Sequence, residues 1–150
     1  MAIAALLRQK NTEVISVSPE ATLMEVTALI SSRRIGAVVV MAGEKRLAGV
    51  VSERDVVKAI AARGEAALRL TAADVMTTDV VTATPRTTVN EAMRMMDAGY
   101  FRHLPVMEDG EMIGIISVRD AVRSHIQSQA QEVSSLIDYV HRGAKADGLR

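Results

Sequence analysis

GVVSERDVV at residues 49–57 recurs as GIISVRDAV at residues 114–122, 65 positions further along the chain. A second pair of stretches matches at an offset of 66, namely SPEATLME at residues 18–25 and TPRTTVNE at residues 84–91. The one-residue change in offset falls in polar, glycine-containing turns, where a change of loop length is tolerated. We infer that the chain consists of two copies of one unit.

Both copies predict the same order of elements: a short strand, a helix, a two-stranded hairpin and a second helix. The first helix of each copy begins with Thr-x-x-Glu, the capping-box pattern, and continues with apolar residues at helical spacing. The second helix begins at Glu53 or Val118. The order β-α-β-β-α, repeated, predicts an α/β fold of the α+β type, with two small sheets that are each covered by helices. The expected strands are residues 14–17, 37–41 and 47–52 in the first copy, and 80–82, 103–107 and 112–117 in the second.

Helices are also expected outside the two copies. Residues 2–10 predict a short N-terminal helix, and residues 64–71 a linker in which Ala66, Leu68 and Leu70 lie against the body. After Asp120 an apolar helical pattern continues to Val140, which predicts a helix of about 25 residues and about 37 Å. Residues 2–10, a partner chain, or both are expected to cover it. We therefore divide the chain into residues 1–70, 71–128 and 129–150, with a frayed tail from residue 144.

Composition excludes several classes of protein. The formal net charge is zero and there are only two tyrosines and one phenylalanine, which argues against a nucleic-acid surface. There is no cysteine, no signal peptide and no apolar run of the roughly 18 residues that a membrane span needs. We expect a cytoplasmic protein without membrane or nucleic-acid partners. His125 and His141 lie too far apart for a metal pair, and no nucleophile–base set or P-loop is present, so we expect no enzymatic activity.

Three groups of residues give the chain a family resemblance. They are DVMT at residues 74–77, RHLPV at residues 102–106, and the two Gly-x-x-Ser-x-x-Asp blocks. Together they resemble a tandem pair of CBS domains, or Bateman module, over residues 12–128. The resemblance implies two repeats packed about a pseudo-twofold axis. It also implies two clefts that hold AMP, ADP or ATP, and sometimes NAD or S-adenosylmethionine, and it implies a homodimer.

The Ser-x-x-Asp blocks have two interpretations. Ser52 with Asp55, and Ser117 with Asp120, have the spacing of a helix cap, in which side chains satisfy backbone donors. The same groups suit a nucleotide, because a carboxylate can chelate ribose hydroxyls and a helix start attracts phosphate. The resemblance assigns Asp120 to ribose and Ser117 to phosphate or ribose. We favour the ligand interpretation in the second copy.

Basic residues near these blocks are candidates for phosphate contacts. The resemblance implies this role for Arg102 and His103, although a surface arginine and a strand-edge histidine are the simpler alternative. Arg119 and Arg54 are further candidates, since guanidinium groups form paired bonds to phosphate oxygens. The first copy has Gly36 and Ala37 where the second has Arg102 and His103. We therefore group Arg102 and His103 with Asp120, and expect the second copy to bind phosphate better.

Prolines and the adjacent backbone are candidates for the purine slot. Pro105 cannot donate a ladder hydrogen bond, so an edge or irregular position is expected. The resemblance implies that residues 81–84, which include Thr82 and Thr84, and apolar neighbours such as Pro105 line an adenine slot.

The sequence thus predicts a non-catalytic regulatory protein that senses an adenosine nucleotide, forms a homodimer and acts on an unidentified protein in signal transduction. The alternatives are a scaffold with vestigial clefts and a pair that binds NAD or S-adenosylmethionine.

Overall fold

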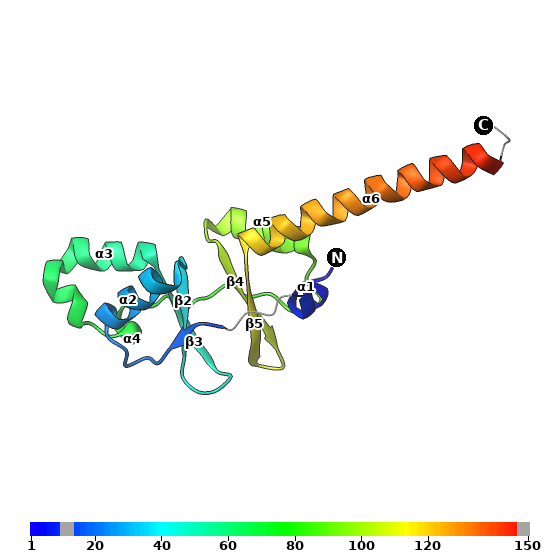
Figure 1. The fold of residues 1–150 in the computed structure, drawn as a ribbon. Helices are drawn as coiled ribbons and strands as arrows, with labels where there is room; N and C mark the ends of the chain where they lie inside the picture. The colour runs from blue at the N-terminus through cyan, green and yellow to red at the C-terminus, as the bar shows by residue number, and fades with distance from the viewer. Residues whose placement is uncertain (10–13, 147–150) are drawn as a thin grey trace.

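The structure is a computed structural model that describes residues 1–9 and 14–146 (Figure 1). It confirms the mixed α+β architecture with two repeats of helices on a small sheet, a short N-terminal helix and a long C-terminal one. The first repeat comprises β1 (Ser16–Val17), α2 (Leu23–Arg33), β2 (Ala37–Met41), β3 (Leu47–Ser52) and α3 (Glu53–Arg63). The second comprises α5 (Val89–Gly99), β4 (His103–Glu108), β5 (Glu111–Ser117) and α6 (Val118–Ala146). Outside them lie α1 (Ile3–Gln9), the 3-10 helix η1 (Gly64–Arg69) and α4 (Ala72–Val75).

The sheet of the first repeat has the strand order β1-β2-β3, with β1 parallel to β2 and β2 antiparallel to β3. Val38, Val40 and Val51 on this sheet pack in one core with the buried residues of α2. Those residues, Leu23, Val26 and Ile30, have the helical spacing found in the sequence. The second repeat builds an equivalent core from α5, β4 and β5.

The strand expected at residues 80–82 is absent, and this prediction is wrong. A single parallel bridge, Ala83 to Val106, takes its place, whereas the first repeat forms two such bridges, from Ser16 and Val17 to β2. Pro105 explains the difference. It stands where Val39 stands in the first repeat and has no N–H with which to extend the ladder.

The helix caps follow the sequence closely. Thr22 with Glu25 and Thr88 with Glu91 form the expected capping boxes. A further box at Thr71 and Asp74 opens α4, which the sequence analysis did not identify.

The short helices α1 and α4 each pack on the repeat that they do not directly precede in sequence. α1 precedes the first repeat but packs on the second, where Ile3 and Leu6 join its core and the Ile3 amide donates to the Thr87 carbonyl at 2.8 Å. α4 precedes the second repeat but packs on the first, where the Ala72 amide donates to the Ala21 carbonyl at 2.7 Å. Each repeat is therefore completed by the segment that precedes the other.

The linker packs partly as expected. Leu70 packs against the core of the first repeat and Leu68 is half-buried, but Ala66 is exposed and Ala67 is fully buried in its place. The linker is η1, whose side chains superpose every third residue, so Ala67 and Leu70 share a side.

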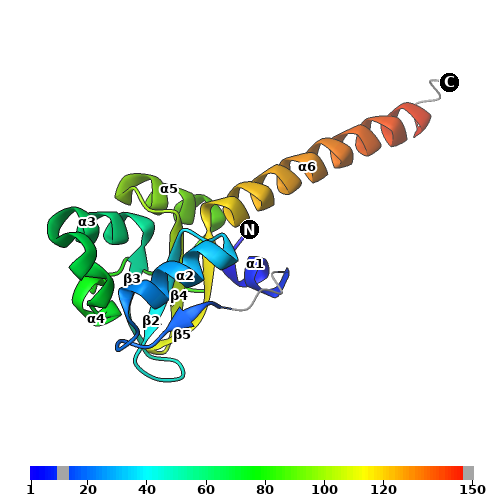
Figure 2. The same ribbon diagram turned by 60° about the vertical axis from the view of Figure 1, so that its left-hand side comes forward.

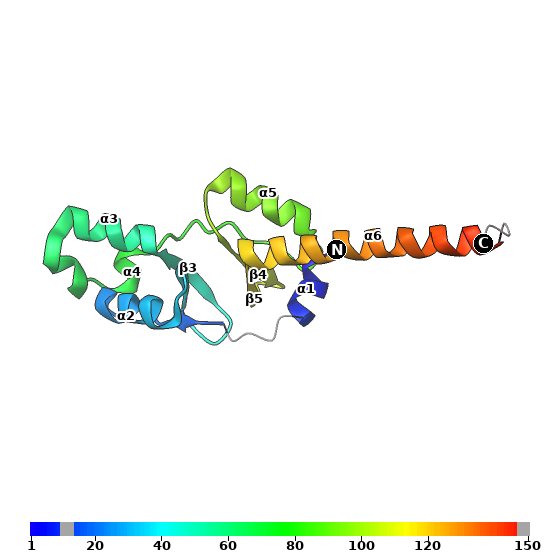
Figure 3. The same ribbon diagram turned by 45° about the horizontal axis from the view of Figure 1, so that its top comes forward.

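α6 is longer than predicted, because Gly143 does not end it. Its 29 residues correspond to about 43 Å. It packs on α5 and β5 at its beginning, where Ser124 is buried and its hydroxyl lies 3.0 Å from the Met1 sulfur. The rest extends away from both repeats in every view (Figures 1–3). All residues from Gln129 to Arg142 are exposed. The N-terminal helix therefore covers only the start of α6, and residues 147–150 of the expected tail lie outside the described part.

Candidate functional site

Two clefts lie between the repeats, and each takes residues from both. The first has a volume of about 710 Å³ and combines the start of α3 with the segment that leads into β4. The second has a volume of about 640 Å³ and combines the start of α6 with β2 and the end of α1. Both volumes fall in the range of roughly 300–1,000 Å³ that is usual for small-molecule sites.

The first cleft has a helix start as its polar floor. The Ser52 amide donates to Oδ2 of Asp55 at 2.9 Å, and the Asp55 amide donates to the Ser52 hydroxyl at 3.2 Å. The Ser52 hydroxyl also lies 3.0 Å from the same Oδ2. The predicted helix cap is therefore present. Of the two carboxylate oxygens of Asp55, only Oδ2 takes part in these contacts with Ser52. The position of the other oxygen, Oδ1, is compatible with a role towards a ligand.

The opposite wall of the first cleft comes from the second repeat. Arg102 extends across it, and its Nη2 lies 3.7 Å from Oε2 of Glu53 at the start of α3. Both side chains are more than half exposed. A Cβ at Gly36 would lie 3.0 Å from Arg102 Nη2, so the absence of a side chain there makes room for the arginine. A guanidinium from one repeat thus faces a helix start of the other.

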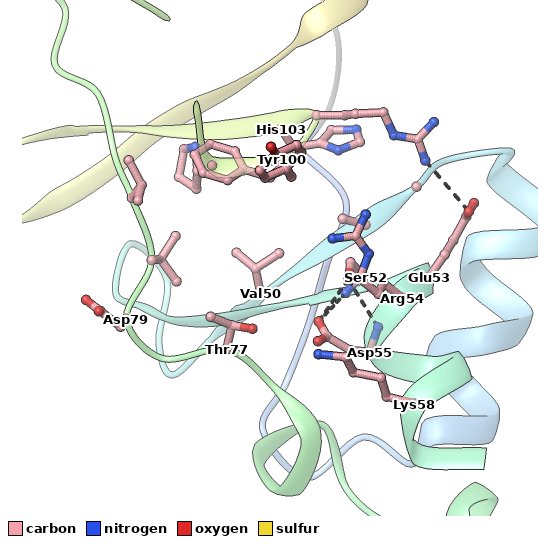
Figure 4. Close-up of a pocket in the computed structure, with 18 of the residues that line it drawn as sticks. Val50, Ser52, Glu53, Arg54, Asp55, Lys58, Thr77, Asp79, Tyr100 and His103 are labelled. Carbon is pink, nitrogen blue, oxygen red and sulfur yellow. Dashed lines mark hydrogen bonds and ion pairs between the residues drawn. The ribbon is translucent and has the colours of Figure 1, made fainter. Parts of the chain in front are cut away.

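Further side chains give the first cleft a mixed lining. Figure 4 shows Arg54 and Lys58 on the same side as Asp55, and Tyr100 and His103 on the opposite wall. Tyr100 ends α5 in a left-handed conformation with φ 57° and is exposed. The apolar part of the lining consists of Ala37, Val50, Val57, Val80, Val81, Phe101 and Pro105.

The second cleft repeats the helix start with other surroundings. The Ser117 amide donates to Oδ2 of Asp120 at 2.9 Å, and the Asp120 amide donates to the Ser117 hydroxyl at 3.1 Å. Arg119 and Arg123 provide the positive charge. Its apolar lining is aliphatic: Leu6, Ile15, Ile35, Ala37 and Ile115.

The structure corrects how the sequence grouped the candidate residues. Arg102 lines the cleft of Asp55, not that of Asp120, and His103 lines both. The repeats face each other, so each helix start shares its cleft with residues of the opposite repeat as well as with residues of its own hairpin. The expectation that the second copy owes stronger phosphate binding to Arg102 therefore loses its basis.

The residues expected to line a purine slot are only partly brought together. Val80 and Val81 line the cleft of Asp55, together with Pro105. Thr82 and Thr84 line neither cleft. The Thr84 amide instead donates to the Thr87 hydroxyl at 3.0 Å in a local turn.

Lys58 and Arg123 line the clefts but were not predicted from the sequence. Both stand four residues after a candidate arginine, Arg54 or Arg119, and so lie one helical turn further on the same face. The two positions also match at the 65-residue offset. A basic residue at this spacing in both copies is the sequence signal that could have identified them.

Neither a metal centre nor a membrane-spanning helix is found in the described part of the chain. Over residues 1–9 and 14–146, no three His, Cys, Asp or Glu side chains are grouped so that they could hold a metal ion. Within the same residues, no helix combines the length and apolarity needed to cross a membrane.

Comparison with known proteins shows which family the chain that forms these clefts resembles. The sequence profile of the CBS domain matches residues 7–62 and 72–126. The chain is 34% identical over 126 residues to CBS domain-containing protein CBSX3, mitochondrial, of Arabidopsis thaliana, a match that covers 81% of this chain and 61% of that protein. The crystal structure of the CBS-domain containing protein ATU1752 from Agrobacterium tumefaciens has 36% sequence identity and a TM-score of 0.78, covering 83% of this chain and 99% of that one. The Agrobacterium chain therefore contains little besides such a pair.

A third relative carries a ligand. The CBS domain protein PAE2072 from Pyrobaculum aerophilum, whose structure is a complex with AMP, has 28% sequence identity and a TM-score of 0.70, covering 80% of this chain and 89% of that one. With a CBS profile matched twice and the two-repeat architecture reproduced, the chain belongs to the CBS-domain family, as a tandem pair.

Proposed function

We propose that this CBS pair is a non-catalytic regulatory module that binds an adenosine nucleotide, AMP, ADP or ATP, in the clefts between its repeats. The observation that carries the proposal is the position of Arg102 opposite Ser52 and Asp55 across one cleft. The AMP complex of the Pyrobaculum relative supports the same ligand class.

Each part of a nucleotide has a suitable partner in the first cleft. Asp55 suits the ribose, since a carboxylate accepts hydrogen bonds from two neighbouring hydroxyls. Arg102, Arg54 and Lys58 suit phosphate, because charge-assisted hydrogen bonds to a guanidinium or ammonium are strong. Val80 and Val81 offer the purine an apolar wall and nearby main-chain groups. In the second cleft Asp120, Ser117, Arg119 and Arg123 would act in the same way.

The regulatory step follows from where these groups originate. Asp55 belongs to the first repeat and Arg102 to the second, so a nucleotide held by both would connect them. A ligand shifts a conformational equilibrium by its difference in affinity for the two states. Binding would therefore favour the arrangement of the repeats in which both partners reach the ligand, and a second protein would respond to that arrangement.

The remaining expectations belong to the same proposal. We propose that the chain forms a homodimer and that it regulates an unidentified protein in signal transduction. We also propose a cytoplasmic location. Because the Arabidopsis relative is named mitochondrial, cell fractionation is the experiment that decides the compartment. We also propose the division at residues 70 and 128, with the qualification that α1 packs on the second repeat. Limited proteolysis would test these boundaries.

The ligand class is tested by thermal shift with AMP, ADP, ATP, NAD and S-adenosylmethionine, with GMP as control. A ligand at 100 times its Kd should stabilise the folded chain by about 2.7 kcal/mol. We expect adenosine nucleotides to raise the Tm and a double Asp55→Asn, Asp120→Asn variant to lose the effect. A rise in Tm with NAD or S-adenosylmethionine alone would mean that this compound, and not an adenosine nucleotide, is the ligand. If no compound raises the Tm, the result would favour a scaffold with vestigial clefts.

A further inference from the structure

The distal part of α6 carries an apolar stripe that nothing in the described chain covers. Large apolar side chains at Ile126, Val133, Leu136, Ile137 and Val140 are each at least half exposed, between 50% and 64%. Most helices in proteins owe their stability to packing of such a face. A stripe of this length on a helix that leaves the body therefore requires a partner.

The spacing of the stripe identifies the kind of partner. From Val122 to Val140 the residues that face one side recur at intervals of four and three, which is the heptad of a coiled coil. Ile126, Val133 and Val140 occupy the a positions, and Val122, Gln129 and Leu136 the d positions. All three a residues are β-branched and one d residue, Leu136, is leucine; β-branched residues at a with leucine at d favour two parallel strands.

The charge of the helix bears on whether its partner is a membrane or a second helix, and the polar d residue Gln129 bears on the direction of that second helix. Between residues 122 and 140, the charged side chains are Arg123, Glu132 and Asp138, so this part of the helix carries no excess of positive charge. This composition disfavours an anionic membrane surface, which attracts helices with a basic polar face. Gln129 would meet its own copy in a parallel pair, so that the two amides can bond to each other. In an antiparallel pair it would face an apolar residue, at a cost for its unsatisfied amide.

We propose that residues 122–140 of α6 form a parallel, in-register, two-stranded coiled coil with α6 of a second copy of this chain, with the Gln129 pair fixing the register. The proposal specifies the interface of the homodimer proposed above and does not depend on nucleotide binding. It places both pairs of repeats at the same end of the coil. α6 begins at the second cleft, since Ser117 and Asp120 cap it, so the dimer interface and that cleft lie on one continuous helix.

The first test is the mass of the full chain at tens of micromolar by light scattering. We expect twice the monomer mass of 16.1 kDa. Leu136→Asp places a charge in the apolar seam and should give the monomer, while Ser135→Asp, at an exposed position outside the seam, should stay dimeric. The Tm should show that the repeats of both variants remain folded, because residues 129–142 contribute nothing to either core.

The second test fixes the orientation. The chain has no cysteine, so Gln129→Cys and Leu136→Cys each introduce a single thiol. In the parallel arrangement each variant should form a disulfide with itself under mild oxidation. A dimeric chain in which neither variant forms a disulfide with itself would mean that the helices are not parallel and in register, and would overturn the proposal. A monomeric wild type would overturn both the coil and the homodimer. A Leu136→Asp protein that is still dimeric would overturn the coil alone, and so would binding of the full wild-type chain through α6 to vesicles with anionic lipid, lost in Leu136→Asp.

Discussion

Replacing Arg102 with alanine should weaken AMP binding in one cleft and leave the other unchanged. Arg102 and Asp55 come from different repeats but line the same cleft, while Asp120 lines the second. Hydrogen bonds from a charged group to phosphate contribute roughly 1.5–3 kcal/mol. In the free protein Arg102 has a substitute partner, the Glu53 carboxylate at 3.7 Å.

That ion pair reduces the expected loss. Both of its side chains are mostly exposed, and pairs of this kind contribute about 0.2–1 kcal/mol. The difference leaves about 0.5–2.8 kcal/mol, or a loss of roughly twofold to 100-fold in affinity. Glu53→Gln removes the carboxylate that competes for the guanidinium and should tighten binding about 1.4- to fivefold.

The assay is calorimetric titration with AMP at fixed salt, with Asp55→Asn and Asp120→Asn identifying the two binding events. Arg94→Ala is the matched control, because Arg94 is exposed on α5 and lines neither cleft. The reasoning is refuted if Arg102→Ala weakens the event that depends on Asp120, or if it changes neither event.

Three further predictions concern the sites and the packing. Asp55→Asn and Asp120→Asn should each abolish one AMP-binding event in calorimetry and keep the helix cap, because the serine N-cap remains and the asparagine amide oxygen can still accept from the serine backbone amide; loss of both events from either change would contradict independent clefts. Gly49→Ala should destabilise the fold by about 1–3 kcal/mol in urea unfolding, because its Cβ would lie 2.7 Å from both the Met76 sulfur and the Thr77 carbonyl oxygen. Gly43→Ala, where the nearest atom would be 4.0 Å away, should change little, and equal effects would count against this packing. Hydrogen bonds from the backbone and side chain of Thr71 lower the pKa of Asp74 below its ordinary 3.8, so their stabilisation is present above pH 3.8 and lost as the pH falls further. Acid titration of stability should be steeper in wild type than in Asp74→Asn, and identical curves would contradict this role.

The helices and hairpins were predictable because each sequence pattern occurs in both copies and so confirms the interpretation of the other. The same cap and the same apolar spacing occur twice, and the hairpins follow from their polar turns. Deviations have local causes as well. Pro105 removes a donor and with it a strand, and the 3-10 geometry of the linker buries Ala67 in place of Ala66.

What the sequence did not indicate is how the repeats meet. Residues close in sequence, such as Arg102 and Asp120, were grouped in one site, but packing of the repeats places Arg102 against Asp55. The same limit applies to α1, which lies beside the first repeat in sequence and in the core of the second in space. Periodicity specifies which face of an element is buried, and it carries no information about which of two similar bodies covers that face.

Calorimetric titration of the intact chain with AMP tests the central claim most directly. The account predicts a saturable heat with at least one site per chain, abolished in the folded double variant Asp55→Asn, Asp120→Asn. A folded wild-type chain that gives no saturable heat at millimolar AMP, or one that binds AMP equally well without both carboxylates, would contradict it.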